Sequence, residues 1–222
     1  MPVDGSVASF RERYRREEIH GRYYGWAHLA FTSVVCLATV GYAALMVDHP
    51  SAAEWLTVPV VFLYANLVEY LGHRGPMHHP VRWLRLLYQR HTRQHHRFFT
   101  DQAMSFERSE DFKAVLFPPV MILFFIGGFG VPMWLALHFL ATDNVAWMAV
   151  ATAIAYYLNY EWLHFAYHCD PASRIGRIPG VQALRRLHLL HHRPKLMMSK
   201  NFNITYPLAD ALFHTLQLDP DK

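Results

Sequence analysis

Clustered histidines are the residues of this chain with the clearest chemical potential. Imidazole is a common ligand of zinc, copper, iron and nickel, and side chains three or four residues apart share one face of a helix. Ten of the sixteen histidines fall in four short stretches, HRGPMH (73–78), HTRQHH (91–96), HFAYH (164–168) and HLLHH (188–192). The candidate metal ligands are His73, His78, His91, His95, His96, His164, His168, His188, His191 and His192.

The number of these imidazoles predicts two metal ions. A tetrahedral zinc site takes four ligands, so ten imidazoles fit two ions of higher coordination number with positions left for water or oxygen. His91 and His95 are four apart and His188 and His191 three apart, so each pair is expected on one helix face. The adjacent His191 and His192 diverge, so one helix can serve two metals, and HTRQHH can do the same. A neutral all-nitrogen shell fits Zn, Cu, Fe or Ni; redox chemistry would select iron, which zinc can replace in a purified sample.

The first stretch leaves one ligand open. His73 and His78 are five residues apart, a spacing that a regular helix separates, and Gly75 and Pro76 indicate that the helix ends there. The two imidazoles can still converge if the chain turns. His78 is the weakest of the ten candidates because His79 offers an alternative ligand.

Two acidic residues precede ligand histidines by about one helical turn. Glu69 and Glu161 lie within or near apolar stretches, where a buried acid is costly and usually has a partner. We expect each to accept an N–H from a ligand imidazole and so to fix its tautomer. Direct metal ligation, or an ordinary ion pair with Arg74 or another arginine, are the alternatives.

The rest of the chain has the character of a membrane protein. Its 222 residues are 53% hydrophobic, and apolar stretches at about 23–47 and 52–71 are each close to the ~20 residues that cross a bilayer. A third apolar block, about 114–168, reads as two spans joined by a loop near 141–144, with a kink or break at the GGFGVP segment. The sequence therefore predicts an all-α fold, a four-helix transmembrane bundle with a cytoplasmic helical histidine-rich cap.

Charge placement supports this topology. All 21 lysines and arginines lie in three regions, 11–22, 74–113 and 174–222. Four spans with both termini cytoplasmic put every one of them, and all four histidine stretches, on the inner side of the membrane. Because these basic residues flank apolar segments, the net charge of +4 does not indicate nucleic-acid binding, and two cysteines are too few for a disulfide framework. We expect a cytoplasmic N-terminal segment (1–22) and a single membrane domain (23–222).

The order of the four stretches, H-x4-H, H-x3-HH, H-x3-H and H-x2-HH, resembles the histidine boxes of the fatty acid hydroxylase/sterol desaturase superfamily. The tail NFNITYPLADALFHT (201–215) is similar to that family's ending, although His214 stands where the family often has glycine. The resemblance implies a membrane-embedded non-haem di-iron enzyme with the ten histidines as ligands. Such enzymes use O2 and two electrons to insert oxygen into, or remove hydrogens from, an unactivated C–H of a lipid.

Hydroxylation is the favoured activity and desaturation the alternative, because the related desaturases usually have Asn or Gln in the third box, where this chain has His164 and His168. A metal transporter would need ionisable residues along its spans, and a non-catalytic metal-stabilised membrane protein would need fewer ligands. No nucleotide, flavin or haem motif is present, so electrons are expected from a separate cytochrome, ferredoxin or reductase. The sequence does not identify the lipid, which can be fatty acyl, sphingolipid, sterol-like or carotenoid, or the oligomeric state.

Overall fold

The computed structural model describes residues 5–219, and every named element in that range is helical, with one isolated bridge between Thr100 and Ala103 as the extended pairing. The all-α prediction is confirmed. The α-helices are α1 (Gly5–Glu18), α2 (Gly25–Leu45), α3 (Thr57–Gly72), α4 (Arg85–Tyr88), α5 (His96–Phe98), α6 (Pro119–Phe125), α7 (Val131–Leu140), α8 (Asp143–Tyr167), α9 (Pro179–His191) and α10 (Leu208–Leu212). Three π-helical segments, η2 (His73–Met77), η4 (Gln89–His95) and η6 (Ile126–Gly130), and three 3-10 turns, η1 (Glu54–Leu56), η3 (Arg82–Leu84) and η5 (Ser109–Ala114), complete the elements.

The chain divides into two compact units. One, here the helical unit, comprises Trp26–Ala65 and Phe117–Glu161. The other, here the histidine unit, comprises the described residues up to Gly25, Asn66–Leu116, and those from Trp162 onward. α3 and α8 each contribute residues to both units. The ten candidate ligands, which are far apart in sequence, all belong to the histidine unit.

Three helices in the described part of the chain are long and apolar enough to cross a membrane: Gly25–Leu45, Glu54–Met77 and Ser109–Leu140. The last of these runs through η6, so the glycine-rich segment continues the helix as a π-helical stretch between α6 and α7. α8 has 25 residues but is less apolar, since it carries Asn159 and Glu161 among several tyrosines. The fourth predicted span stays a prediction.

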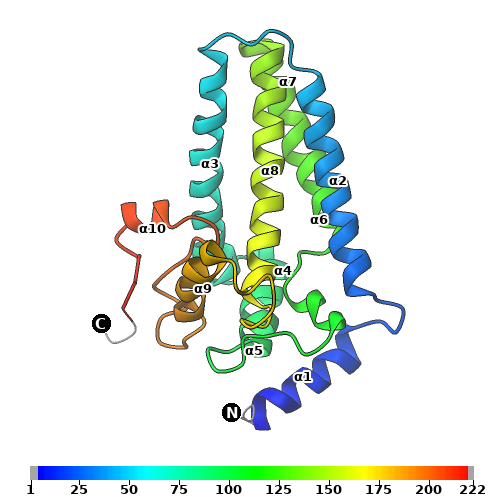
Figure 1. Ribbon diagram of the computed structural model, residues 1–222, viewed down its shortest axis with the longest axis vertical. Helices are drawn as coiled ribbons and strands as arrows, with labels where there is room; N and C mark the ends of the chain where they lie inside the picture. Colours follow the sequence, from blue (N-terminus) through cyan, green and yellow to red (C-terminus); the bar gives the residue numbers. More distant parts are fainter. Residues whose placement is uncertain (1–4, 220–222) are drawn as a thin grey trace. The chain divides into compact units, whose positions relative to one another are not determined.

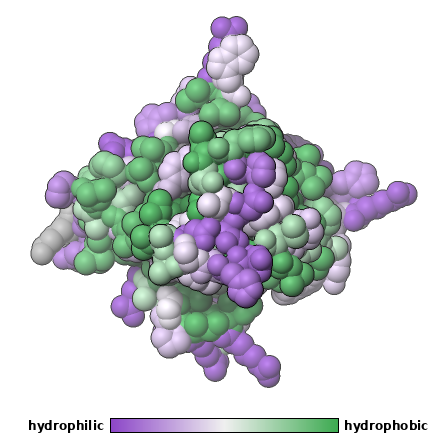
Figure 2. Space-filling model, turned by 90° about the horizontal axis from the view of Figure 1, so that it is seen from above, coloured by the Kyte–Doolittle hydropathy of each residue, from purple (hydrophilic) through white to green (hydrophobic). Residues whose placement is uncertain are grey.

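Within the helical unit, one stripe of α8 forms the core. Val150, Ile154 and Leu158, four residues apart, pack with Cys36 of α2 and Ile122 of α6 in a buried cluster. The two connections that lack lysine and arginine are tied together: Asp48 N–H donates to Asn144 Oδ1 (2.8 Å) and the Thr142 hydroxyl donates to Glu54 Oε1 (2.5 Å). They lie at the same end of this unit's helices (Figure 1), and hydrophobic residues surround a hydrophilic centre in the view onto that end (Figure 2).

Candidate metal centre

The ten candidate ligands are all buried and lie in two adjacent groups. The first group is His73, His78, His91, His96 and His191. The second group is His95, His168, His188 and His192, and His164 adjoins it, with its Nε2 3.2 Å from that of His95. The fit of these groups to a metal is judged from the positions and protonation of their ligand atoms.

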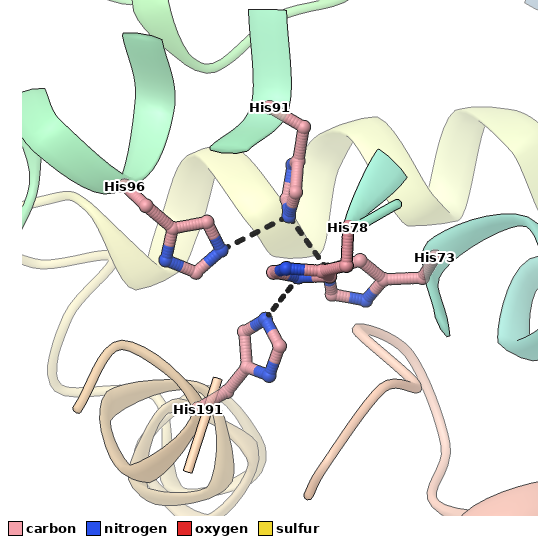
Figure 3. A group of neighbouring side chains, drawn as sticks. All are labelled: His73, His78, His91, His96 and His191. Atoms are coloured by element: carbon pink, nitrogen blue, oxygen red, sulfur yellow. Dashed lines mark hydrogen bonds between the residues drawn. The ribbon is translucent and has the colours of Figure 1, made fainter. Parts of the chain in front are cut away.

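In the first group the Nε2 atoms converge on one small volume (Figure 3). Their separations are 2.7 Å for His73 and His91, 3.0 Å for His78 and His191, and 3.0 Å for His96 and His91. The second group is equally tight. The corresponding distances are 3.1 Å for His95–His192, 3.1 Å for His168–His188 and 3.0 Å for His192–His188.

Two π-helical segments explain how histidines five residues apart meet. A π-helix bonds residue i to i+5, so that spacing returns to the same face. η2 brings His78 to within 3.2 Å of His73, and η4 ends where His96 approaches His91. The spacing of His91 and His95 predicted a shared helix face, and their rings do stack with centroids 5.1 Å apart, but His91 belongs to the first group and His95 to the second.

α9 serves both groups. His188 and His192 are four apart and face the second group, while His191 turns to the first. The expectation that His191 and His192 diverge, so that one helix contributes to two groups, is confirmed, and His188 joins His192 rather than His191.

His78, not His79, lies in the first group. His78 is buried with its Nε2 3.0 Å from that of His191, whereas His79 is exposed and its ring contacts the Arg74 carbonyl at 2.9 Å. The other six histidines lie outside both groups. The geometry thus favours His78 as the ligand.

Backbone carbonyls set the tautomers of half of these rings. A carbonyl oxygen can only accept, so a ring whose Nδ1 faces one carries the proton there and presents a lone pair at Nε2. Five rings donate in this way: His73 to Phe202, His95 to Ala114, His168 to Met104, His191 to Lys200 and His192 to Phe99.

The position of the ring proton of a sixth histidine, His78, follows by elimination. Thr92 donates its hydroxyl proton to the Met77 carbonyl at 2.7 Å, so its oxygen accepts from His78 Nδ1 at 3.3 Å. In the pair His95 and His192, and in the pair His78 and His191, each of the two facing Nε2 atoms therefore presents a lone pair, and no proton lies between them. Such pairs about 3 Å apart repel unless a cation lies between, and this is the structural observation that fits a metal.

Burial keeps these imidazoles neutral. Loss of solvation lowers the pKa of His191 to about 4, and burial together with neighbouring histidines lowers the pKa of His78 to about 2. Burial likewise holds the pKa of His96, His188 and His192 well below the usual value. Neutral imidazole is the form that binds a metal.

The predicted acidic residues have other partners. Glu69 accepts hydrogen bonds from Ile204 N–H, from Thr205 N–H (2.9 Å) and from the Thr205 hydroxyl (2.6 Å). The carbonyl of Phe202 takes the Nδ1 proton of His73, the role expected of Glu69. Glu161 belongs to the helical unit and accepts from Phe117 N–H at 3.3 Å. A contact of either acid with a ligand imidazole stays a prediction.

The tail that follows α9 is organised by a buried carboxylate that the sequence analysis did not select. Asp210 accepts from Phe202 N–H (2.9 Å), Asn203 N–H (2.7 Å) and the Thr215 hydroxyl (2.6 Å). These bonds hold the stretch whose carbonyls at Lys200 and Phe202 orient two rings of the first group. The sequence signal that could have identified Asp210 is an acidic residue among the apolar residues of the tail.

His214 adopts φ 58° in this tail. Left-handed backbone at that angle suits glycine best, because other side chains crowd the following carbonyl. This explains why a related chain would have glycine here. His214 is one of three non-glycine residues with positive φ in the described chain, with His49 and Asn201.

Comparison with known proteins gives a consistent result. A sequence model described as fatty acid hydroxylase matches residues 58–215, a range that includes all ten histidines. The chain is 26% identical over 175 residues to a dihydroceramide fatty acyl 2-hydroxylase of Arabidopsis thaliana, covering 75% of this chain and 65%, slightly under two thirds, of that relative. A solved structure of full-length Scs7p, in which only the hydroxylase domain is visible, shares the fold at a TM-score of 0.61 and 19% identity, over 90% of this chain and 69% of that one.

Proposed function

This chain belongs to the fatty acid hydroxylase family, and we propose that it is an integral membrane di-iron enzyme that uses O2 to hydroxylate an unactivated C–H of a membrane lipid. The observation that carries the proposal is the pair of adjacent buried imidazole groups, in each of which two facing Nε2 atoms both carry lone pairs. Each group is a set of neutral ligands, and the two are close enough to share η4 and α9.

The spacing of the ligand atoms favours more than four ligands per ion. At a metal–nitrogen distance of about 2.1 Å, nitrogens at right angles lie about 3.0 Å apart and tetrahedral ones about 3.4 Å apart. The closest Nε2 pairs in the two groups are 2.7 to 3.2 Å apart, nearer the right-angle value. Two iron ions with the ten histidines as ligands meet this requirement, and zinc can replace iron in a purified sample.

When bound, two irons would store the two electrons delivered by an external donor and would supply the Lewis acidity that O2 activation needs. The protein's own residues hold the ligands and keep water out. Five carbonyls fix the imidazole tautomers, and the rings are almost completely buried. A hydrocarbon substrate suits such a dry site, and the name of the Arabidopsis relative places the acyl chain of a sphingolipid first among the lipids to test.

We propose four spans, with α8 as the fourth, and a cytoplasmic metal centre, because all lysines and arginines fall in segments assigned to one side. Electrons would come from a separate cytochrome, ferredoxin or reductase. Exposed arginines of the histidine unit, among them Arg93, Arg97 and Arg186, suit an acidic carrier.

The test is lipid profiling in a host that lacks the protein, grown with iron and air and a competent reductase. Wild type is expected to produce a lipid heavier by one oxygen, labelled when ¹⁸O2 is supplied, and two irons per chain. His191→Ala should abolish the product, and the matched control His79→Ala, an exposed neighbour of the site, should retain it. A product that has lost two hydrogens without gaining ¹⁸O would instead establish the desaturase alternative. Identical profiles for wild type and His191→Ala, with a sphingolipid and free fatty acids both supplied, would refute the proposal.

A further inference from the structure

A buried arginine of α1 contacts the segment that orients the second group. Arg11 is 2% exposed. Its guanidinium donates to the Phe98 carbonyl (2.8 Å), the Ala103 carbonyl (2.5 Å) and the Glu107 carboxylate (2.6 Å). A buried cation is costly unless all its donors are used, and the planar fork of arginine satisfies three acceptors at once.

The neighbours of two of these acceptors orient ligand candidates, and the same segment orients a third. Phe99, directly after Phe98, accepts from His192 Nδ1 at 2.8 Å. Met104, directly after Ala103, accepts from His168 Nδ1 at 2.7 Å. The segment ends at Ala114, whose carbonyl accepts from His95 Nδ1 at 3.0 Å.

Further contacts hold α1 against this segment. Arg15, one turn after Arg11, forms a paired contact with the fully buried Asp111, with Nε and Nη2 2.8 and 2.9 Å from its two oxygens. Asp111 in turn accepts from Glu107 N–H at 2.9 Å. The ring of Tyr14 packs edge-on against Phe98 with centroids 5.3 Å apart, and α1 lies along α5 (Figure 1).

We infer that Arg11 is a positioning residue for the second group: it fixes the carbonyls of residues 98–104, which in turn hold His192 and His168 with Nε2 directed at the metal. The inference rests on the proposed metal binding. It assigns a role to α1, which lies outside the range matched by the family, residues 58–215. The first group takes its carbonyls from the tail and has no direct bond to Arg11 among those described.

The test measures Co²⁺ binding to the full-length apoprotein in detergent, by absorption and by metal analysis. Two backgrounds separate the groups: His191→Ala weakens the first, and His168→Ala weakens the second. Adding Arg11→Gln is expected to lower Co²⁺ affinity about 10-fold in the His191→Ala background, where the second group remains, and less than about 3-fold in the His168→Ala background. The d–d absorption of Co²⁺ should change only in the first case.

Controls keep the outcome specific. Arg16→Gln removes the same charge from the same helix, at a side chain 75% exposed, and should leave both affinities unchanged. Arg11→Lys retains the charge but not the fork and should give an intermediate loss confined to the second group. Equal loss in both backgrounds, no loss in either, or failure of both Arg11 variants to fold would overturn the inference. If the wild-type chain binds no Co²⁺, the proposed metal centre itself fails, a result that these variants do not produce.

Discussion

The two histidine groups use the same orienting device but are supported by different parts of the chain. In each, backbone carbonyls accept Nδ1 protons and leave Nε2 free to bind a metal. The first group draws its carbonyls from the tail, which Asp210 and Glu69 hold within the family-matched range. The second draws them from residues 99–114, which α1 holds from outside that range. The same orientation of the imidazole rings is therefore reached with different supporting contacts.

The supports differ in chemistry as well as in origin. Asp210 is a fully buried acceptor that gathers three donors of the tail. Arg11 is a buried donor that gathers three acceptors, one of them the half-exposed carboxylate of Glu107. Because a partly exposed charge pair is screened by water, the two carbonyl bonds of Arg11 carry most of its effect. The comparison predicts that a substitution in either support should weaken metal binding more in the group which that support holds than in the other group.

The largest expected effect comes from the adjacent ligands His191 and His192. If the two groups hold the proposed ions, substituting either residue by alanine should reduce metal content from two ions to one and lower hydroxylation by at least about 100-fold, because the two residues belong to different groups. Metal analysis and product formation measure this. In a double variant both ions should be lost. Retention of two ions in either single variant would show that the groups do not act as separate sites.

Asp210→Asn should have the next largest effect. The amide keeps one acceptor oxygen in place of two, so at least one of the bonds from Phe202, Asn203 and Thr215 is lost in a buried site. We expect a loss of about 2–4 kcal/mol in stability and weaker Co²⁺ binding in the first group. Thermal unfolding and the His168→Ala background report the two quantities. Glu17→Gln, at an exposed acid, is the control, and a weakening confined to the second group would contradict the division of support.

The smallest expected effect is a gain. His214→Gly removes the crowding of left-handed backbone at the end of the tail, where φ is 58°. Since glycine also loses more entropy on folding, the net stabilisation should be about 0.5–1 kcal/mol, a rise in Tm of roughly 2 °C. Metal affinity of the second group should not change. A lower Tm would show that the His214 side chain makes a stabilising contact that outweighs the backbone cost.

The sequence predicted the helical fold, the family and the set of ten clustered histidines, because residue type, spacing and apolar runs can be read from the sequence directly. It did not determine how the histidines divide between the two groups. His91 meets His96 through a π-helical segment, and nothing in HTRQHH distinguishes that geometry from an α-helix. The choice between His78 and His79 also required the structure, since both are histidine and only the turn after Pro76 buries one of them.

The roles of Arg11 and Asp210 were beyond reach of the sequence for a related reason. Each acts on backbone groups, and every residue except proline has the same N–H and C=O. The residue type at a position therefore does not indicate whether its carbonyl orients an imidazole ring. The sequence by itself determined which side chains can bind metal and that helices carry them. The tertiary structure decided how they divide into two groups and what holds each ring, because those contacts join residues such as Phe99 and His192 that are distant along the chain.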